Sequence, residues 1–295
     1  MNDKKQLKAT LAALLTNVIF GFSFLFSKVA LSYSHPLVIL AVRFTVAFAV
    51  LNILWVFGVF KMKFKGKARA RILMMAIAQP VCYYVFELYG IKLTSSAISG
   101  VIISLVPVIV IILATVFLRE RPTLPQVIFS VISLGAIAVI SLSSSDGAEN
   151  TLAGILLLLG AVLCASVFNI LSRKESKEYS PIERTYIMFL AGTVGFNLIA
   201  ALTLGDGYIE EILSASVHME FWGAIAYLAI ASSIVAFLMY NYSTTILPPV
   251  RSASYSNLIT VVSVLAGIFI LGEELSPTVL VCCAAVIVGV LGVNK

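Results

Sequence analysis

Long apolar runs, separated by short polar connections, dominate the pattern of this chain. Each run is about as long as the ~20 residues that an α-helix needs to cross the hydrocarbon core of a bilayer. In lipid, a run of this length has to be helical, because its backbone groups must pair within the segment. The pattern therefore predicts ten membrane-spanning helices, over residues 9–31, 36–60, 71–91, 95–118, 124–143, 152–172, 181–204, 221–246, 251–271 and 276–293.

The composition agrees with lipid as the main solvent of the chain. Hydrophobic residues make up 60% of the 295 residues and charged residues only 12%, and the mean hydropathy is +1.06. A soluble domain usually carries about 25% charged residues. Because almost everything outside the ten runs is a short connection, no room is left for a separate soluble domain. The predicted fold class is an all-α integral membrane protein.

Lys and Arg are distributed unequally between the connections. The connection KMKFKGKARAR (61–71) holds six basic residues, whereas SSSDGAENT (143–151) and GDGYIEEILSASVHMEF (205–221) hold none. Cytoplasmic connections of membrane proteins are enriched in Lys and Arg. We therefore expect both termini to face the cytoplasm, and the net charge of +6 to reflect orientation rather than binding to nucleic acid.

The chain also contains an internal repeat. A shift of 145 residues places SKVALSYSHPLVILAVRF (27–44) over SRKESKEYSPIERTYIMF (172–189), and a shift of 153 places Glu120 over Glu273. Five crossings per copy is an odd number, so the second copy must be inserted upside down. The predicted architecture is two inverted five-helix repeats, residues 1–147 and 148–295. Secondary transporters built in this way bind their substrate near the bilayer midplane, between the halves.

These features, in this order, resemble the drug/metabolite transporter superfamily and, more narrowly, its EamA-type permeases. The resemblance covers nearly the whole chain and rests on FGFSFLFSKVAL in the first predicted span, on the stretch from Leu105–Pro107 to LRE (118–120), and on LGEELSPT and VIVGVLG in the second half. Thr260 departs from it, because the family often has proline there, and so does Ser130, where glycine is common. The resemblance implies a carrier of small metabolites, often an exporter of amino acids, with a central cavity lined by predicted spans 1, 3, 4, 6, 8 and 9.

Ionisable groups inside lipid are costly and therefore mark candidate functional sites. Tyr83 and Glu87 lie one turn apart in the predicted span 71–91, and Glu87 is a candidate substrate-binding or proton-binding carboxylate. The alternative is an ion pair or triad with Arg43 and Lys28 that holds the first three spans together. Arg43 and Lys28 are accordingly candidates for a structural or gating role.

Uncharged polar and aromatic side chains can bind a polar substrate without adding charge to the membrane. For each uncharged candidate named below, the alternative role is packing between helices. Pro107 is expected to bend the fourth span and shape the cavity. Glu120 and Glu273, each at a helix end, are candidates for a gate or a scaffold. The remaining substrate-binding candidates are Asn17, Asn169, Tyr240, Tyr255 and Asn257.

Rival functions lack their sequence signatures. The only two histidines, His35 and His218, belong to predicted connections, and neither an HExxH motif nor a nucleophile elbow occurs. No GxxxxGK[ST] loop is present, so we expect no nucleotide partner. The sequence predicts a carrier that exports a small-molecule substrate across the cytoplasmic membrane by alternating access, with a proton or another ion as the coupling partner and without cofactor, metal or nucleic acid. An integral membrane enzyme and a non-transporting scaffold are the alternatives.

Overall fold

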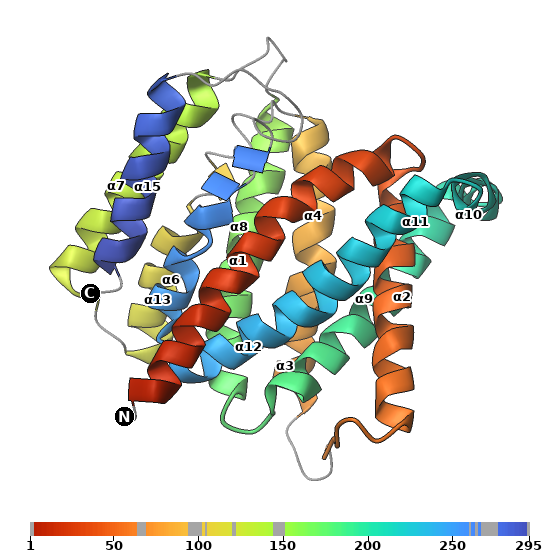
Figure 1. The fold of residues 1–295 in the computed structure, drawn as a ribbon, viewed down its shortest axis with the longest axis horizontal. Coiled ribbons are helices and arrows are strands. Elements are labelled where there is room, and N and C mark those ends of the chain that lie inside the picture. Colours follow the sequence, from red (N-terminus) through yellow and green to blue (C-terminus); the bar gives the residue numbers. More distant parts are fainter. Residues whose placement is uncertain are drawn as a thin grey trace.

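The computed structural model describes residues 3–63, 69–93, 102–103, 105–119, 122–143, 151–259, 261–262, 265–266 and 277–293. Every regular element within these ranges is a helix, which confirms the predicted all-helical class for them (Figure 1). The first half contains α1 (Asp3–Leu31), α2 (Pro36–Val56), α3 (Arg69–Ala76), η1 (Ile77–Cys82), α4 (Tyr83–Lys92), α6 (Val106–Leu113), η2 (Ala114–Leu118) and α7 (Leu124–Ser143).

The second half begins with two long helices and also contains a π-helical segment, η3. Its helices are α8 (Leu152–Glu175), α9 (Pro181–Leu204), α10 (Gly207–Ser216), α11 (Met219–Ala226), η3 (Tyr227–Val235), α12 (Ala236–Ile246), α13 (Pro249–Ser254) and α15 (Pro277–Val293).

Six helical stretches in the described part of the chain are long and apolar enough to cross a membrane. Three shorter apolar helices accompany them, at Val106–Leu118, Leu124–Ala136 and Val281–Val293. The predicted ninth span, 251–271, coincides with α13 at its start and then runs largely beyond the described residues. The six long stretches are Lys4–Leu31, Pro36–Val56, Ala70–Gly90, Leu152–Glu175, Pro181–Leu204 and Met219–Ile246.

Local sequence explains where α2 and α9 begin. His35 caps α2 by accepting a hydrogen bond from the amide of Leu37 at 3.3 Å, and Pro36 follows in the first turn. Ser180 and Glu183 form a reciprocal capping box at the start of α9. A capping side chain satisfies amides that have no partner inside the helix, and proline is tolerated in the first turn because its missing N–H is not needed there.

The structure refines three details of the predicted spans and their connections. The span predicted at 36–60 ends at Val56, and Gly58 adopts a φ of +73° shortly after it. The span predicted at 71–91 is present as Ala70–Gly90, and it is interrupted at Gln79, which leaves the helical conformation next to Pro80, as expected for a proline within a span. The connection predicted at 205–220 contains α10, which is too short and too polar to be recognised as a span.

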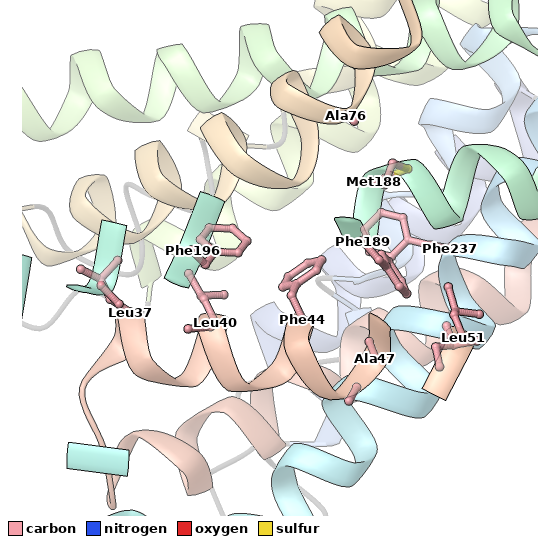
Figure 2. Close-up of a cluster of buried hydrophobic side chains, with 14 of the residues drawn as sticks. Leu37, Leu40, Phe44, Ala47, Leu51, Ala76, Met188, Phe189, Phe196 and Phe237 are labelled. Carbon is pink, nitrogen blue, oxygen red and sulfur yellow. The ribbon is translucent and has the colours of Figure 1, made fainter. Parts of the chain in front are cut away.

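The largest buried cluster lies between α2 and α9, with contributions from α3 and α12 (Figure 2). Phe44 forms its centre, with ring centroids 5.6 Å from Phe189 and 5.1 Å from Phe196. Gly192 allows the close approach of α9, since a Cβ atom there would lie 2.6 Å from Phe44 Cδ1. Elsewhere, α7 packs against α15, α1 against α12 and α4 against α8 (Figure 1).

The two ends of the helical bundle differ in their contacts and charge. At the basic end, α2 and α8 end and α3 and α9 begin, and Arg71 there forms ion pairs with Glu175 and Glu178. At the α10 end, α1 ends and α2 begins, and Ser34 there hydrogen-bonds to Glu211 of α10. Helices from both halves therefore meet at each end.

Candidate substrate-binding site

Tyr83 and Glu87 form a hydrogen-bonded pair on consecutive turns of α4. The Tyr83 hydroxyl donates to Glu87 Oε1 over 2.7 Å. Both side chains are partly accessible rather than fully buried. Tyr83 packs against a buried cluster that includes Val106 of α6 and Ala165 of α8. The carboxylate is thus oriented by a tyrosine that packs beside helices of both halves, in a span that is otherwise mostly apolar.

Arg43 is buried in α2, with 5% of its surface exposed. Its Nε donates to Ser233 Oγ at 2.8 Å, and its Nη2 donates to Ser232 Oγ at 3.1 Å. Both serines belong to η3, a helix with wide i→i+5 turns, and such turns are rare and frequently lie at functional sites. Arg43 therefore connects α2 of the first half to the π-helical segment of the second.

Aromatic faces complete the surroundings of Arg43. Its Cζ lies 5.5 Å from the ring centroids of both Phe44 and Tyr84, within the range of a cation–π contact. The Tyr84 ring in turn lies 5.2 Å from that of Tyr83. Among the described side chains, no ion pair joins Arg43 to Glu87. Serine hydroxyls and aromatic rings, rather than this carboxylate, contact the guanidinium.

A second pair of candidates meets between α8 and α12. The Tyr240 hydroxyl donates a hydrogen bond to Asn169 Oδ1, and Asn169 Nδ2 donates to the carbonyl of Ala165 at 2.9 Å. The Tyr240 ring stacks on Phe168, with centroids 5.6 Å apart. Ala165 belongs to the cluster against which Tyr83 packs, so both pairs lie against α8.

Three further candidates lie in the part of the bundle formed by α1 and residues 249–259. Asn17 is 2% exposed and donates to the carbonyl of Ala13 at 2.7 Å. Ala13 belongs to the same buried cluster as Tyr255. Asn257 is also buried. Among the described contacts, Tyr240 thus meets Asn169, and Asn17 lies one turn from a residue of the cluster that contains Tyr255.

The gating candidates fall partly outside the described residues. Pro107 occupies the first turn of α6 rather than the middle of a continuous helix, a position where proline costs no helical hydrogen bond. It therefore marks the beginning of a helix within the predicted span 95–118. Glu120, Glu273 and the side chain of Lys28 lie outside what the structure describes.

Sequence reasoning missed a buried hydrogen-bond centre at the basic end. Arg184, in the first turn of α9, is fully buried. Its Nη1 donates to the carbonyl and the Oγ of Ser172 at 2.7 and 2.8 Å and to Thr244 Oγ1 at 3.1 Å. Its Nη2 donates to Thr245 Oγ1 at 2.6 Å and to the carbonyl of Asn241. The only signal in the sequence was a charge one turn inside an apolar run.

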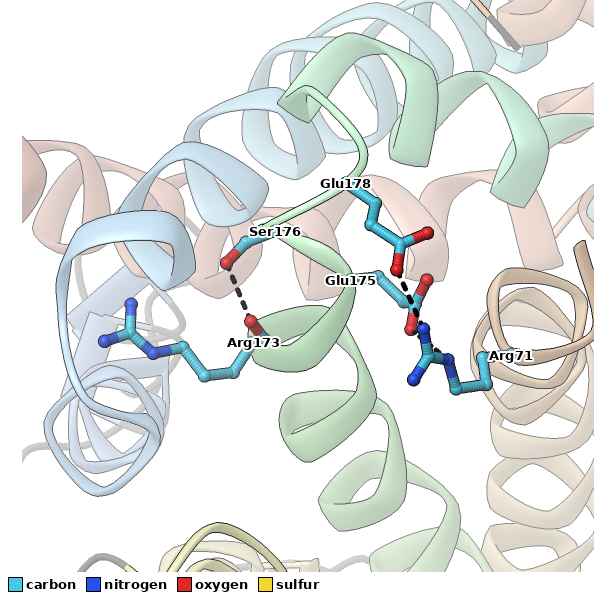
Figure 3. Close-up of polar contacts among 5 residues, drawn as sticks. All are labelled: Arg71, Arg173, Glu175, Ser176 and Glu178. Atoms are coloured by element: carbon cyan, nitrogen blue, oxygen red, sulfur yellow. Dashed lines mark hydrogen bonds and ion pairs between the residues drawn. The ribbon is translucent and has the colours of Figure 1, made fainter. Parts of the chain in front are cut away.

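A second contact at the basic end joins the two halves through ion pairs (Figure 3). Arg71 Nε lies 3.0 Å from Glu175 Oε1, and Arg71 Nη2 donates to Glu178 Oε1 at 3.0 Å. The Glu175 side chain has no exposed surface, whereas that of Arg71 is 52% exposed. One arginine on α3 thus links the end of α8 to the first half of the chain.

Comparison with known proteins gives the same broad assignment along the whole chain. The sequence model of the EamA-like transporter family matches residues 7–142 and 152–295. The uncharacterized transporter YcxC of Bacillus subtilis is 33% identical over 296 residues, covering 100% of this chain and 95% of that protein. An uncharacterized transporter of Archaeoglobus fulgidus is 25% identical, covering 96% and 98% respectively.

More distant similarities agree with these matches. A protein from Streptantibioticus cattleyicolor, named as a probable terminal-alkyne amino-acid exporter, is 26% identical over 213 residues, covering 72% of this chain and 69% of that protein. A crystal structure of another protein superposes with a TM-score of 0.79 at 17% identity, covering 96% of this chain and 95% of that one, and shows the fold alone. The apolar helices of the present chain and its matches to transporters together indicate a multi-pass membrane protein. The match to the family model over nearly the whole sequence shows that this chain belongs to the EamA-like transporter family.

Proposed function

We propose that this protein is a secondary transporter that moves a small polar or amphipathic metabolite, such as an amino acid or a related compound, by alternating access. The observation that carries the proposal is the Tyr83–Glu87 pair, a partly accessible carboxylate inside apolar helices and beside both halves of the chain. An ionisable group at such a position is costly and is typical of substrate and proton pathways.

The packing of the helices supports two inverted five-helix repeats, residues 1–147 and 148–295. In chain order, α1 corresponds to α8 and α4 corresponds to α12. If the two halves are interchanged, the contact α1–α12 becomes the contact α8–α4, and the reverse. The contacts α2–α9 and α7–α15 each join corresponding helices of the two halves, so the interchange leaves them unchanged. The division of the family match into residues 7–142 and 152–295 supports the same boundary. One unit used in both orientations can open toward either side of the membrane in turn.

Export of an amino acid or related compound has one additional support, the name of the relative from Streptantibioticus cattleyicolor. A cytoplasmic location of the basic end follows from the positive-inside rule, since Arg71, Arg173 and Lys174 lie there. In this orientation the protein sits in the cytoplasmic membrane with both termini inside. Glu87 is the candidate for coupling to a proton, and the bilayer and the substrate are the expected partners.

Purified protein in proteoliposomes provides the test. Vesicles loaded with a mixture of unlabelled amino acids are expected to accumulate a labelled amino acid by counterflow, and the initial rate should saturate with concentration. A channel would give a rate that does not saturate, and an enzyme or a scaffold would give none. A screen for growth rescue under toxic metabolite load would then identify the substrate. Absence of saturable flux for every compound that gives rescue would contradict the proposal.

A further inference from the structure

The helix α10 presents three distinct faces. Tyr208 and Ala215 face the protein and are buried. Ile209 and Leu213 form an apolar face with exposures of 58% and 62%, and Val217, directly after the helix, continues it with 78%. The positions on the third face, Glu210 and Ser214, are exposed and polar. At 100° per residue these groups occupy successive sectors of the helix surface.

The protein-facing side of α10 is fixed by hydrogen bonds to both halves of the chain. The Tyr208 hydroxyl donates to Asn197 Oδ1 of α9 at 2.7 Å. Glu211 Oε2 accepts from Ser34 Oγ at 3.2 Å and from the amide of His35 at 3.1 Å, immediately before α2. The rotation of α10 about its own axis is therefore determined, and the apolar face has a defined direction.

The orientation of α10 differs from that of the spans beside it. Figure 1 shows α10 nearly end-on, next to α2 and α11, which are seen from the side. A helix at the end of the bundle and steeply inclined to α2 lies roughly in the plane of the membrane surface. Trp222 lies nearby, 40% exposed, with its Nε1 donating to the carbonyl of Ser216 at 2.9 Å. Tryptophan is enriched where membrane meets water.

The helices beside α10 also carry strongly exposed apolar side chains. At the end of α9, Leu198 and Leu202 are 57% and 78% exposed, and Met219 at the start of α11 is 81% exposed. In a chain with membrane-spanning helices, these side chains belong to the lipid-facing belt. Because α10 packs against both α9 and α11, its exposed apolar residues lie beside helices that carry this belt.

We propose that α10 is an interfacial helix, whose residues Ile209, Leu213 and Val217 insert between the lipid headgroups and acyl chains while Glu210 and Ser214 remain in water. Helices with one apolar and one polar face bind membranes in this way. Residues 205–221 contain no Lys or Arg, so the partner is the apolar part of the bilayer surface rather than an anionic headgroup. Phosphatidylcholine alone should be sufficient.

A spin-label experiment tests the direction of the apolar face. In a background with the four cysteines replaced by serine or alanine, a nitroxide is attached at Leu213→Cys and, as a matched control on the adjacent polar face, at Ser214→Cys. In phosphatidylcholine vesicles, the label at 213 should collide often with oxygen, which concentrates in lipid, and rarely with a water-soluble nickel chelate. The label at 214 should show the reverse.

Similar nickel accessibility at both positions would overturn the proposal. Low accessibility to both reagents at 213, with dipolar coupling between labels, would instead indicate a second copy of the chain and would also overturn it.

A second measurement keeps all four cysteines. The chain contains two tryptophans, so Trp55→Phe leaves Trp222 as the only one. Its fluorescence should be quenched more strongly by phosphatidylcholine brominated close to the headgroup than by phosphatidylcholine brominated near the chain ends. The same spectrum should persist when phosphatidylglycerol is added. No quenching by either brominated lipid would contradict the inference.

Discussion

The hydroxyl of Tyr83 donates a 2.7 Å hydrogen bond to Glu87 Oε1, one turn further along α4. This bond orients the carboxylate inside a membrane-spanning segment, and no side chain in the described part of the chain donates to its second oxygen. Arg43, the buried cation on α2, does not form an ion pair with this carboxylate, since its guanidinium donates to Ser233 and Ser232. The arrangement separates the two charges and gives each a different set of partners.

Replacement of Glu87 by Gln tests whether this carboxylate carries the coupling proton. The amide has nearly the same size but cannot take up and release a proton. We expect the variant to fold normally and to lose transport driven by a pH gradient in proteoliposomes. Glu178→Gln, which changes a partly exposed carboxylate at the basic end, is the matched control and should keep that transport. An unchanged pH dependence in Glu87→Gln would reject the proton relay.

Arg184 is expected to be a major source of stability in the second half. Arg184→Ala leaves acceptors from α8 and α12 without their donor, at a position with no exposed surface. Hydrogen bonds to charged groups contribute about 1.5–3 kcal/mol each. Because the substitution removes several of them, the free energy of unfolding should fall by more than one such bond contributes. Thermal unfolding in detergent measures it.

Arg173→Ala is the control for this experiment. Arg173 Nη1 donates to the carbonyls of Thr244 and Thr245, but its side chain is only partly buried. The control should therefore lower the unfolding temperature much less than Arg184→Ala. Equal effects of the two substitutions would mean that burial of Arg184 adds nothing.

The link between Arg71 and Glu175 should show measurable energetic coupling between the two halves. Exposed ion pairs usually contribute about 0.2–1 kcal/mol. Because the Glu175 side chain has no exposed surface, we expect a coupling of about 1 kcal/mol or more, within the range of about 0.5–3 kcal/mol found for residues in one ion-pair network. A double-mutant cycle of Arg71→Gln and Glu175→Gln, followed by thermal unfolding, measures it. Strict additivity of the two substitutions would contradict the link.

Gly192 is expected to tolerate no larger side chain. A Cβ atom there would lie 2.6 Å from Cδ1 of Phe44, which is held between Phe189 and Phe196 and cannot move aside. Overpacking of this kind costs about 1–3 kcal/mol, so Gly192→Ala should lower the unfolding temperature. The control is Gly223→Ala in α11, where no atom of the described residues beyond the adjoining helix backbone and chain neighbours lies within 4 Å of the added carbon. That substitution should be neutral or stabilising, by up to ~1 kcal/mol. The reverse order would refute the packing argument.

Much of the helical architecture was predictable because its signals are local. The apolar runs at 152–172 and 181–204 correspond to α8 and α9, and residues at their starts such as Thr151, Ser180 and Pro181 carry ordinary capping chemistry. The Tyr83–Glu87 pair was predictable for the same reason, since its members are four residues apart. The helix α10 was not predicted, because it is only ten residues long and mixes apolar and polar side chains, so it does not form a continuous apolar run.

By itself, the sequence determined that this chain is helical and membrane-embedded, because lipid offers unpaired backbone groups no partner outside the helix. Only the tertiary structure decided which polar groups meet. Tyr240 and Asn169 are 71 positions apart, and Arg43 and Ser233 are 190 apart. Such partnerships depend on how each helix is rotated and crossed against its neighbours. Hydropathy records how apolar a segment is, but it does not record the direction of each side chain.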